Sequence, residues 1–148
     1  MPQVGVMIEV PASVYQARAL AQKLRESERL ETRCSDGRAL PVQDLYDVVL
    51  VDAPCSGLGT LRRHPEIAWR EDPGRRPDLL KLQGELLRAG AQHVAPGGLL
   101  AYAVCTFATD EGRPPTPEGF GVERPPSLTR PSEGLDAFWS TTWRRPSS

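Results

Sequence analysis

Two cysteines, Cys55 and Cys105, have the residue type and the position that best suit chemistry in this chain. Each stands just after an apolar run, residues 48–51 and 99–104, of the kind that forms a strand buried in a parallel sheet. Parallel strands end at the same edge of a sheet, so we expect the two thiols to lie close together. A thiolate can attack an electron-poor ring carbon while a second thiol moves a proton, and the pair therefore suits covalent catalysis. The competing interpretation is that both are ordinary buried hydrophobic residues, the commonest role of a free cysteine.

Asp52 stands at the point where the first of these apolar runs becomes a polar loop. Ligands of open α/β sheets bind outside the carboxyl ends of the strands, so an acid here can hold or protonate a bound ring. The alternative is that Asp52 caps a following helix while Pro54, Gly57 and Gly59 shape a turn. A site at this strand end is our first hypothesis.

Residues 60–76, which we call the basic stretch, follow this loop. The stretch is rich in arginine and carries an aromatic residue, which suits phosphate contacts and base stacking. The alternative, which the residues alone favour slightly, is a solvated surface loop. The candidates for RNA contact in the stretch are Arg62, Arg63, His64, Trp69 and Arg70, with Arg75 and Arg76 beside them.

The elements that must position these residues alternate as in an α/β domain. The apolar patterns predict strands at residues 4–10, 30–34, 48–51 and 99–104, and amphipathic helices at residues 14–27 and 79–95. The Pro96-Gly97-Gly98 sequence is expected to end the second helix. This order predicts a parallel sheet with right-handed crossovers.

The length of 148 residues corresponds to one domain. We expect its core to span residues 1–111, followed by a Pro/Gly-rich loop at residues 112–134 and by an edge strand and tail at residues 135–148. Six of the 15 prolines lie between Arg113 and Pro131, and they are the reason for predicting the loop.

The composition excludes several classes of protein. A net charge of −1 argues against binding nucleic acid by bulk electrostatics, so any such contact must be local. Three widely spaced cysteines without a Cys-x-x-Cys pair indicate neither a disulfide framework nor a metal site. The chain shows no basic leader and no apolar run of membrane-spanning length, and we therefore expect a cytoplasmic protein.

Several linked segments resemble the Sun/RsmB-type RNA cytosine-5 methyltransferases. They are residues 52–59 (DAPCSGLG), 63–70 (RHPEIAWR), 97–98 (GG) and 102–107 (YAVCTF), and residues 134–138 (GLDAF) are similar to the family's closing strand. The resemblance covers roughly residues 4–107. It implies a Rossmann-like, S-adenosylmethionine-dependent methyltransferase fold with a mostly parallel sheet, and an RNA substrate, an rRNA by family.

The resemblance also implies roles for individual residues. Cys105 would add to carbon 6 of a cytosine, so that carbon 5 accepts the methyl group, and Cys55 would assist release of the adduct. Asp52 would hydrogen-bond the cytosine ring. The cofactor-binding residues would be Glu9 at the ribose hydroxyls and Asp36 at the adenine end, together with Asp52 and Pro54.

The chain departs from the family at its beginning. No first strand and no glycine-rich, Ala-Pro-Gly-Gly-Lys-like loop precede residue 4, so we expect an N-terminally incomplete domain that binds S-adenosylmethionine weakly or not at all.

Three other functions compete with RNA methylation. One is a DNA cytosine methyltransferase, in which Cys55, the cysteine after a proline, would be the nucleophile. A second is a non-catalytic fragment or pseudoenzyme that at most binds RNA or a partner. The third, least favoured, is a hydrolase that pairs Cys55 with His64 or His93.

Overall fold

A computed structural model describes residues 4–8, 35–70, 72–129 and 135–147 of the chain. The helix predicted at residues 14–27, the strand predicted at residues 30–34 and Cys34 lie outside these residues.

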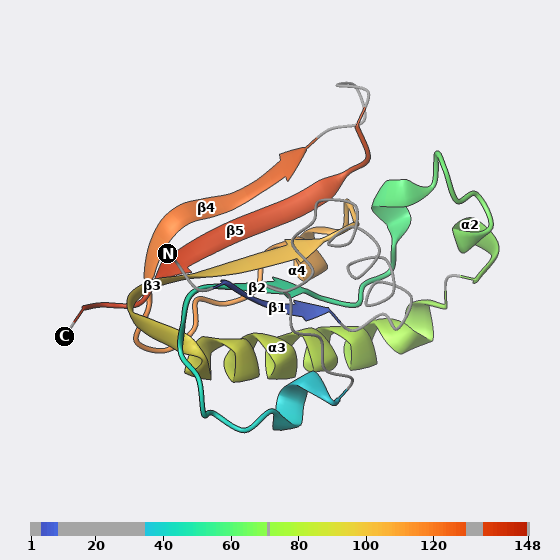
Figure 1. The fold of residues 1–148 in the computed structure, drawn as a ribbon. Helices are drawn as coiled ribbons and strands as arrows, with labels where there is room; N and C mark the ends of the chain where they lie inside the picture. Colours follow the sequence, from blue (N-terminus) through green and yellow to red (C-terminus); the bar gives the residue numbers. More distant parts are fainter. Residues whose placement is uncertain (1–3, 9–34, 71, 130–134, 148) are drawn as a thin grey trace, which may run out of the picture.

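The described strands form a five-stranded sheet in the order β1-β2-β3-β5-β4 (Figure 1). Strands β1 (Val4–Ile8), β2 (Tyr46–Asp52) and β3 (Val94–Val104) run parallel. Strand β5 (Phe138–Arg144) pairs antiparallel with β3 and with β4 (Gly121–Thr129). The sheet is therefore mixed, with the predicted parallel arrangement in the half that carries the two cysteines.

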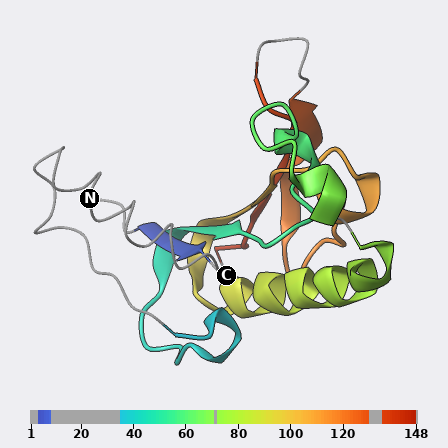
Figure 2. The same cartoon turned by 90° about the vertical axis from the view of Figure 1, so that its right-hand side faces the viewer.

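Helix α3 (Arg76–Gln92) lies across one face of this sheet (Figures 1 and 2). Pro77 in its first turn needs no amide hydrogen there, and Asp78 suits the positive end of the helix dipole. Its inner face buries Leu86 and Leu87. The other helices within the described residues are short: α2 (Ile67–Arg70), α4 (Thr109–Gly112) and the 3₁₀ turns η2 (Gly37–Ala39), η3 (Leu58–Thr60) and η4 (Pro73–Arg75).

The core follows from the two-residue repeat of the strands. Pairing aligns Val49 with Leu100 and Leu100 with Trp143, so that alternate residues of three strands share the face that α3 covers. All three are at most 2% exposed. Val48 and Leu50, on the opposite face of β2, are partly exposed, so the expected burial on both faces is incomplete.

The end of α3 differs from the prediction. The helix ends at Gln92, where the amide of His93 donates to the carbonyl of Gly90, and β3 begins at Val94. The Pro96-Gly97-Gly98 sequence does not end the helix but lies within β3, where the register with β2 shifts. Gly97 has a φ of 76°, which favours glycine, so the sequence forms an irregularity in the strand.

The expectation of a loop over residues 112–134 is wrong in part, because β4 lies within it. Pro125 and Pro126 lack the amide hydrogen that a central strand needs, but β4 is at the edge of the sheet, and its register shifts between Arg124 and Ser127. The edge strand predicted at residues 135–148 is consequently an inner strand, since β5 lies between β3 and β4.

Among the described residues, no helix has the length and apolar character needed to cross a membrane. The same residues contain no group of three or more His, Cys, Asp or Glu side chains suited to a metal ion.

Candidate functional site

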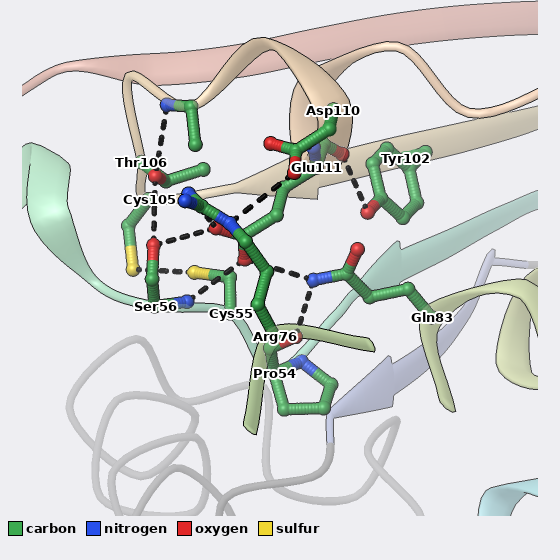
Figure 3. Close-up of polar contacts among 11 residues, drawn as sticks. Pro54, Cys55, Ser56, Arg76, Gln83, Tyr102, Cys105, Thr106, Asp110 and Glu111 are labelled. Atoms are coloured by element: carbon green, nitrogen blue, oxygen red, sulfur yellow. Dashed lines mark hydrogen bonds and ion pairs between the residues drawn. The ribbon is translucent and has the colours of Figure 1, made fainter. Parts of the chain in front are cut away.

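The Sγ atoms of Cys55 and Cys105 are 3.4 Å apart, which confirms the predicted proximity of the two thiols (Figure 3). Cys105 directly follows β3, and Cys55 follows β2, the neighbouring parallel strand. Both residues are partly buried. The carboxyl ends of two parallel strands therefore hold two thiols in contact.

The hydrogen bond between the thiols makes them unequal. It lowers the pKa of Cys105, and it raises the pKa of Cys55, whose burial adds to the rise. Either sulfur can donate in the neutral pair, but these opposite shifts mean that Cys105 ionises first, and Cys55 then donates to its thiolate. Cys105 is the thiol better suited to act as a thiolate nucleophile.

Two glycines shape the loop after Cys55. Gly57 has a φ of 73°, a conformation that side chains rarely adopt. Gly59 passes so close to the backbone of Ala137 that any β-carbon would overlap it. The amide of Gly59 donates to the carbonyl of Cys105, and the amide of Ala137 donates to the carbonyl of Gly59, each at 3.0 Å. The loop is thereby tied to the end of β3 and to the chain before β5.

Glu111 of α4 is the residue of the site that the sequence prediction missed. Its side chain is fully buried beside the thiols and accepts hydrogen bonds from Ser56, Gln83 and Arg76 (Figure 3). The hydroxyl of Tyr102 also donates to its backbone carbonyl at 3.0 Å. An acid six residues after the candidate nucleophile Cys105 was a signal that could have identified it.

Asp52 and Pro54 are at the end of β2, as predicted. The Asp52 side chain is exposed at the strand end, and partial desolvation by the surrounding protein raises the pKa of its carboxyl group. The carbonyl of Pro54 accepts a 2.9 Å hydrogen bond from Nε2 of Gln83 on α3. This bond fixes the backbone between Asp52 and Cys55.

Asp36, another acid assigned to the cofactor, is not beside the thiols. Asp36 caps η2, and hydrogen bonds from the side chain and the amide of Arg38 lower its pKa to about 2. Arg38 also binds Glu85 of α3 at 3.1 Å, so Asp36 lies on the flank of that helix. Glu9 lies outside the described residues.

The basic stretch is partly engaged within the protein. Arg63 forms an ion pair with Asp136, and Arg62 lies 3.8 Å from the same carboxylate. The His64 ring contacts Glu66 at 3.3 Å. Trp69 on α2, which lies away from the sheet in Figure 1, is 90% exposed. The stretch is thus neither a wholly solvated loop nor a wholly free cationic surface.

A cavity of about 210 Å³ lies between Cys55 and this stretch. Its lining consists of Cys55, Ser56, Ile67, Asp72, Arg75, Arg76 and Leu79. A bound group in this cavity would have a thiol on one wall and arginine side chains on another.

The structure does not favour the hydrolase hypothesis. His93 lies before β3, so the full length of that strand separates it from Cys105. The His64 ring is exposed and faces Glu66. Neither imidazole is oriented as a base for Cys55.

Comparison with known proteins identifies similar sequences. A family model described as 16S rRNA methyltransferase RsmB/F matches residues 6–114. The ribosomal RNA small subunit methyltransferase B of Thermus thermophilus is 39% identical over 133 residues, covering 73% of this chain and 31% of that protein. The protein of the same name from Klebsiella pneumoniae is 33% identical over 135 residues, covering 79% of this chain and 31% of that protein. The chain thus spans about a third of the length of these relatives.

The fold is also similar to solved structures. NSun6 from Pyrococcus horikoshii, crystallised with SFG, superposes with a TM-score of 0.72 at 18% sequence identity, covering 97% of this chain and 48% of that chain. This likeness confirms the predicted Rossmann-like methyltransferase fold.

Proposed function

The chain belongs to the RsmB/F family of 16S rRNA methyltransferases, and from this premise we propose that it transfers a methyl group to carbon 5 of a cytosine in RNA through a covalent cysteine adduct. The membership confirms the resemblance to Sun/RsmB-type enzymes, a family that uses S-adenosylmethionine. The observation that carries the proposal is the contact between Cys55 and Cys105 at the carboxyl ends of two parallel strands.

The chemistry divides between the two thiols. The Cys105 thiolate adds to carbon 6 of the cytosine, and the electron pair displaced to carbon 5 takes up the methyl group. Cys55, once its own proton has passed to solvent, takes the proton from carbon 5, and the electron pair of that C–H bond re-forms the double bond to carbon 6 and expels the Cys105 thiolate. We assign Cys55 to this release, because it contacts the departing sulfur. Asp52 is assigned to hydrogen-bonding the cytosine ring.

S-adenosylmethionine, when bound, supplies the methyl group. Of the acids assigned to it, Asp52 is supported by its exposed position at the carboxyl end of β2, where α/β folds bind nucleotides. The engagement of Asp36 by Arg38 gives that residue less support. A methyltransferase from Burkholderia thailandensis with a related fold, at a TM-score of 0.51, was crystallised with S-adenosylhomocysteine. We propose S-adenosylmethionine as the cofactor of this reaction, and we still expect this chain to bind it weakly or not at all.

The substrate class follows from the family description, which names 16S rRNA. Trp69 is available for stacking on an unpaired base, since it is almost fully exposed. Arg62, Arg63, His64 and Arg70 are assigned to the RNA backbone nearby. A cytoplasmic location follows from the same proposal, because a reaction that depends on free thiols requires a reducing compartment.

The test compares the two cysteine variants on RNA. Wild-type chain, Cys105→Ala and Cys55→Ala are incubated with 16S rRNA fragments and S-adenosylmethionine, and denaturing gels reveal covalent protein–RNA species. We expect Cys55→Ala to accumulate the adduct, because attack proceeds and release fails. Cys105→Ala should form neither adduct nor methylated product.

The opposite pattern, an adduct in Cys105→Ala and none in Cys55→Ala, would assign the nucleophile to Cys55, as in a DNA-type enzyme. Binding of RNA without any adduct or product in the wild type and in both variants would favour a non-catalytic protein.

A further inference from the structure

Glu111 is a buried carboxylate whose hydrogen-bonding capacity is filled by groups around the thiols. Its side chain is 0% exposed. The Ser56 amide donates to Oε2 at 2.8 Å and the Ser56 hydroxyl donates to Oε1 at 2.6 Å. Gln83 Nε2 donates to Oε2 at 3.0 Å, and Arg76 Nη2 donates to Oε1 at 3.3 Å (Figure 3). Each oxygen accepts two bonds, which is how a buried charge becomes tolerable.

These bonds determine which group donates at each step of a chain of hydrogen bonds that runs from Glu111 through Ser56 to Thr106, next to Cys105. The Ser56 hydroxyl has one proton, which it gives to Glu111, so it must accept from the Thr106 hydroxyl at 2.9 Å. The Thr106 oxygen in turn accepts from the Ala108 amide at 3.1 Å. Ser56 is the neighbour of Cys55, and Thr106 is the neighbour of Cys105. The carboxylate therefore joins the two segments that carry the thiols.

We propose that Glu111 is a positioning residue that holds the loop of Cys55 in register with Cys105, so that the two thiols can act in sequence on one base. The purpose that we assign to Glu111 rests on the proposed function, whereas the hydrogen bonds by which it holds the loop do not. The loop of Cys55 depends on such support, because Gly57 in it is conformationally permissive. Helix α3 holds the Glu111 carboxylate from the other side through hydrogen bonds from Gln83 and Arg76.

The negative charge of Glu111 does not activate the thiols. It raises the pKa of both Cys55 and Cys105, as the last of the contributing causes. The contribution of the carboxylate lies in where it holds Ser56, and removing it should disturb thiol geometry more than thiol acidity.

The test measures how readily the thiols meet, independently of methylation. In a Cys34→Ser background, glutathione disulfide is attacked by the Cys105 thiolate, which forms a mixed disulfide and releases one glutathione. The Cys55 thiolate then attacks the Cys105 sulfur of that mixed disulfide and releases the second glutathione, closing the protein disulfide. Mass spectrometry of quenched samples gives the rate of each step, and the second rate reports how often the sulfurs come within bonding distance.

Glu111→Gln should slow the closing step about tenfold or more, since bonds to a charged group contribute about 1.5–3 kcal/mol, while formation of the mixed disulfide changes little. The matched control is Asp110→Asn. This neighbouring acid also pairs with Arg76, at 3.2 Å, but its side chain is 48% exposed. Asp110→Asn should leave both steps unchanged.

Ser56→Ala keeps the amide bond to Glu111 and removes only the hydroxyl link, so it tests the proposal even if Glu111→Gln does not fold. It should slow closing by several-fold. The proposal would be overturned if the Cys55–Cys105 disulfide closed at the wild-type rate in folded Ser56→Ala. It would also be overturned if folded Glu111→Gln closed the disulfide at that rate and differed only in a lowered Tm, because Glu111 would then have a structural role alone. If wild-type chain closes as expected but forms no RNA adduct, the proposed function fails while the positioning role stands.

Discussion

Two polar regions border the same cavity and differ in how their charges are used. The thiol cluster, which we define as Cys55, Ser56, Cys105, Thr106 and Glu111, has a buried charge that accepts four hydrogen bonds. In the basic stretch, the side chains of Arg62 and Arg63 are 64% and 57% exposed and share one carboxylate, Asp136. The first arrangement holds atoms in place, and the second leaves hydrogen-bonding capacity for a ligand.

The comparison shows that the type of a residue does not reveal what its side chain contacts in the folded protein. Arg76 belongs to the basic stretch by sequence, but its guanidinium binds Asp110 and the buried Glu111. Arg63 pairs across the molecule with Asp136. Trp69, by contrast, has almost its whole surface exposed to solvent. We therefore place the proposed RNA contact at the segment around α2, rather than at every arginine of the basic stretch.

The largest expected effect is on stability, through the close packing around the thiol cluster. A β-carbon at Gly112 would overlap the indole of Trp139, and one at Gly59 would overlap the backbone of Ala137. Each glycine-to-alanine substitution should lower the free energy of unfolding by about 3 kcal/mol, measured by urea denaturation.

The matched control for this prediction is Gly84→Ala. Gly84 lies in α3 with open space around it, so alanine should stabilise the helix by up to about 1 kcal/mol. Equal stability of Gly112→Ala and Gly84→Ala would show that the cluster is not tightly packed.

The next effect concerns the basic stretch and should leave stability alone. Trp69→Ala should weaken binding of single-stranded RNA by about 1–3 kcal/mol, because one stacked base is lost, while Tm stays unchanged. Fluorescence anisotropy with a labelled oligoribonucleotide measures the affinity. Val122→Ala, at a 56% exposed apolar residue on edge strand β4, is the control and should not alter binding. An unchanged affinity in Trp69→Ala would remove α2 from the RNA surface.

A smaller, several-fold effect distinguishes the two thiols. The hydrogen bond from Cys55 lowers the pKa of Cys105, so Cys55→Ala should raise that pKa, reduce the thiolate fraction at neutral pH and slow alkylation of Cys105 by iodoacetamide. Cys105→Ala should do the reverse and lower the raised pKa of Cys55. Alkylation rates against pH, with Cys34→Ser throughout, measure both. Slower alkylation of the remaining thiol in both variants would mean that the proton is not held on Cys55.

The smallest effect is the pH dependence of the Arg63–Asp136 pair. Arg63 lowers the pKa of Asp136 below its unfolded value of about 3.9, so the stabilisation is present above that pH and is lost as pH falls through the folded pKa. The Tm difference between wild type and Asp136→Asn should therefore shrink as the pH is lowered below about 4. The more exposed Glu123–Arg144 pair is the comparison, and Glu123→Gln should change Tm less at every pH. A Tm difference between wild type and Asp136→Asn that grows as the pH is lowered would contradict the lowered pKa of Asp136.

The sequence by itself determined the elements whose signals are local. The apolar runs at residues 48–51 and 99–104 predicted β2 and β3, because a strand buried in a sheet must be apolar over consecutive residues. The contact of Cys55 with Cys105 followed from the rule that parallel strands end at one edge, and the family followed from the motifs around them. The prediction failed at β4, because prolines that forbid a central strand are tolerated at an edge, and sequence does not state which strand is at the edge.

Only the tertiary structure decided the environment of Glu111 and of the arginines. Ser56, Gln83 and Arg76 are 55, 28 and 35 residues from Glu111 in the chain, and 73 residues separate Arg63 from Asp136. A carboxylate becomes a buried clamp or a solvated surface charge according to which donors surround it once the chain has folded. That convergence depends on the packing of α3, α4 and the strand ends against one another, which no local pattern of residues encodes.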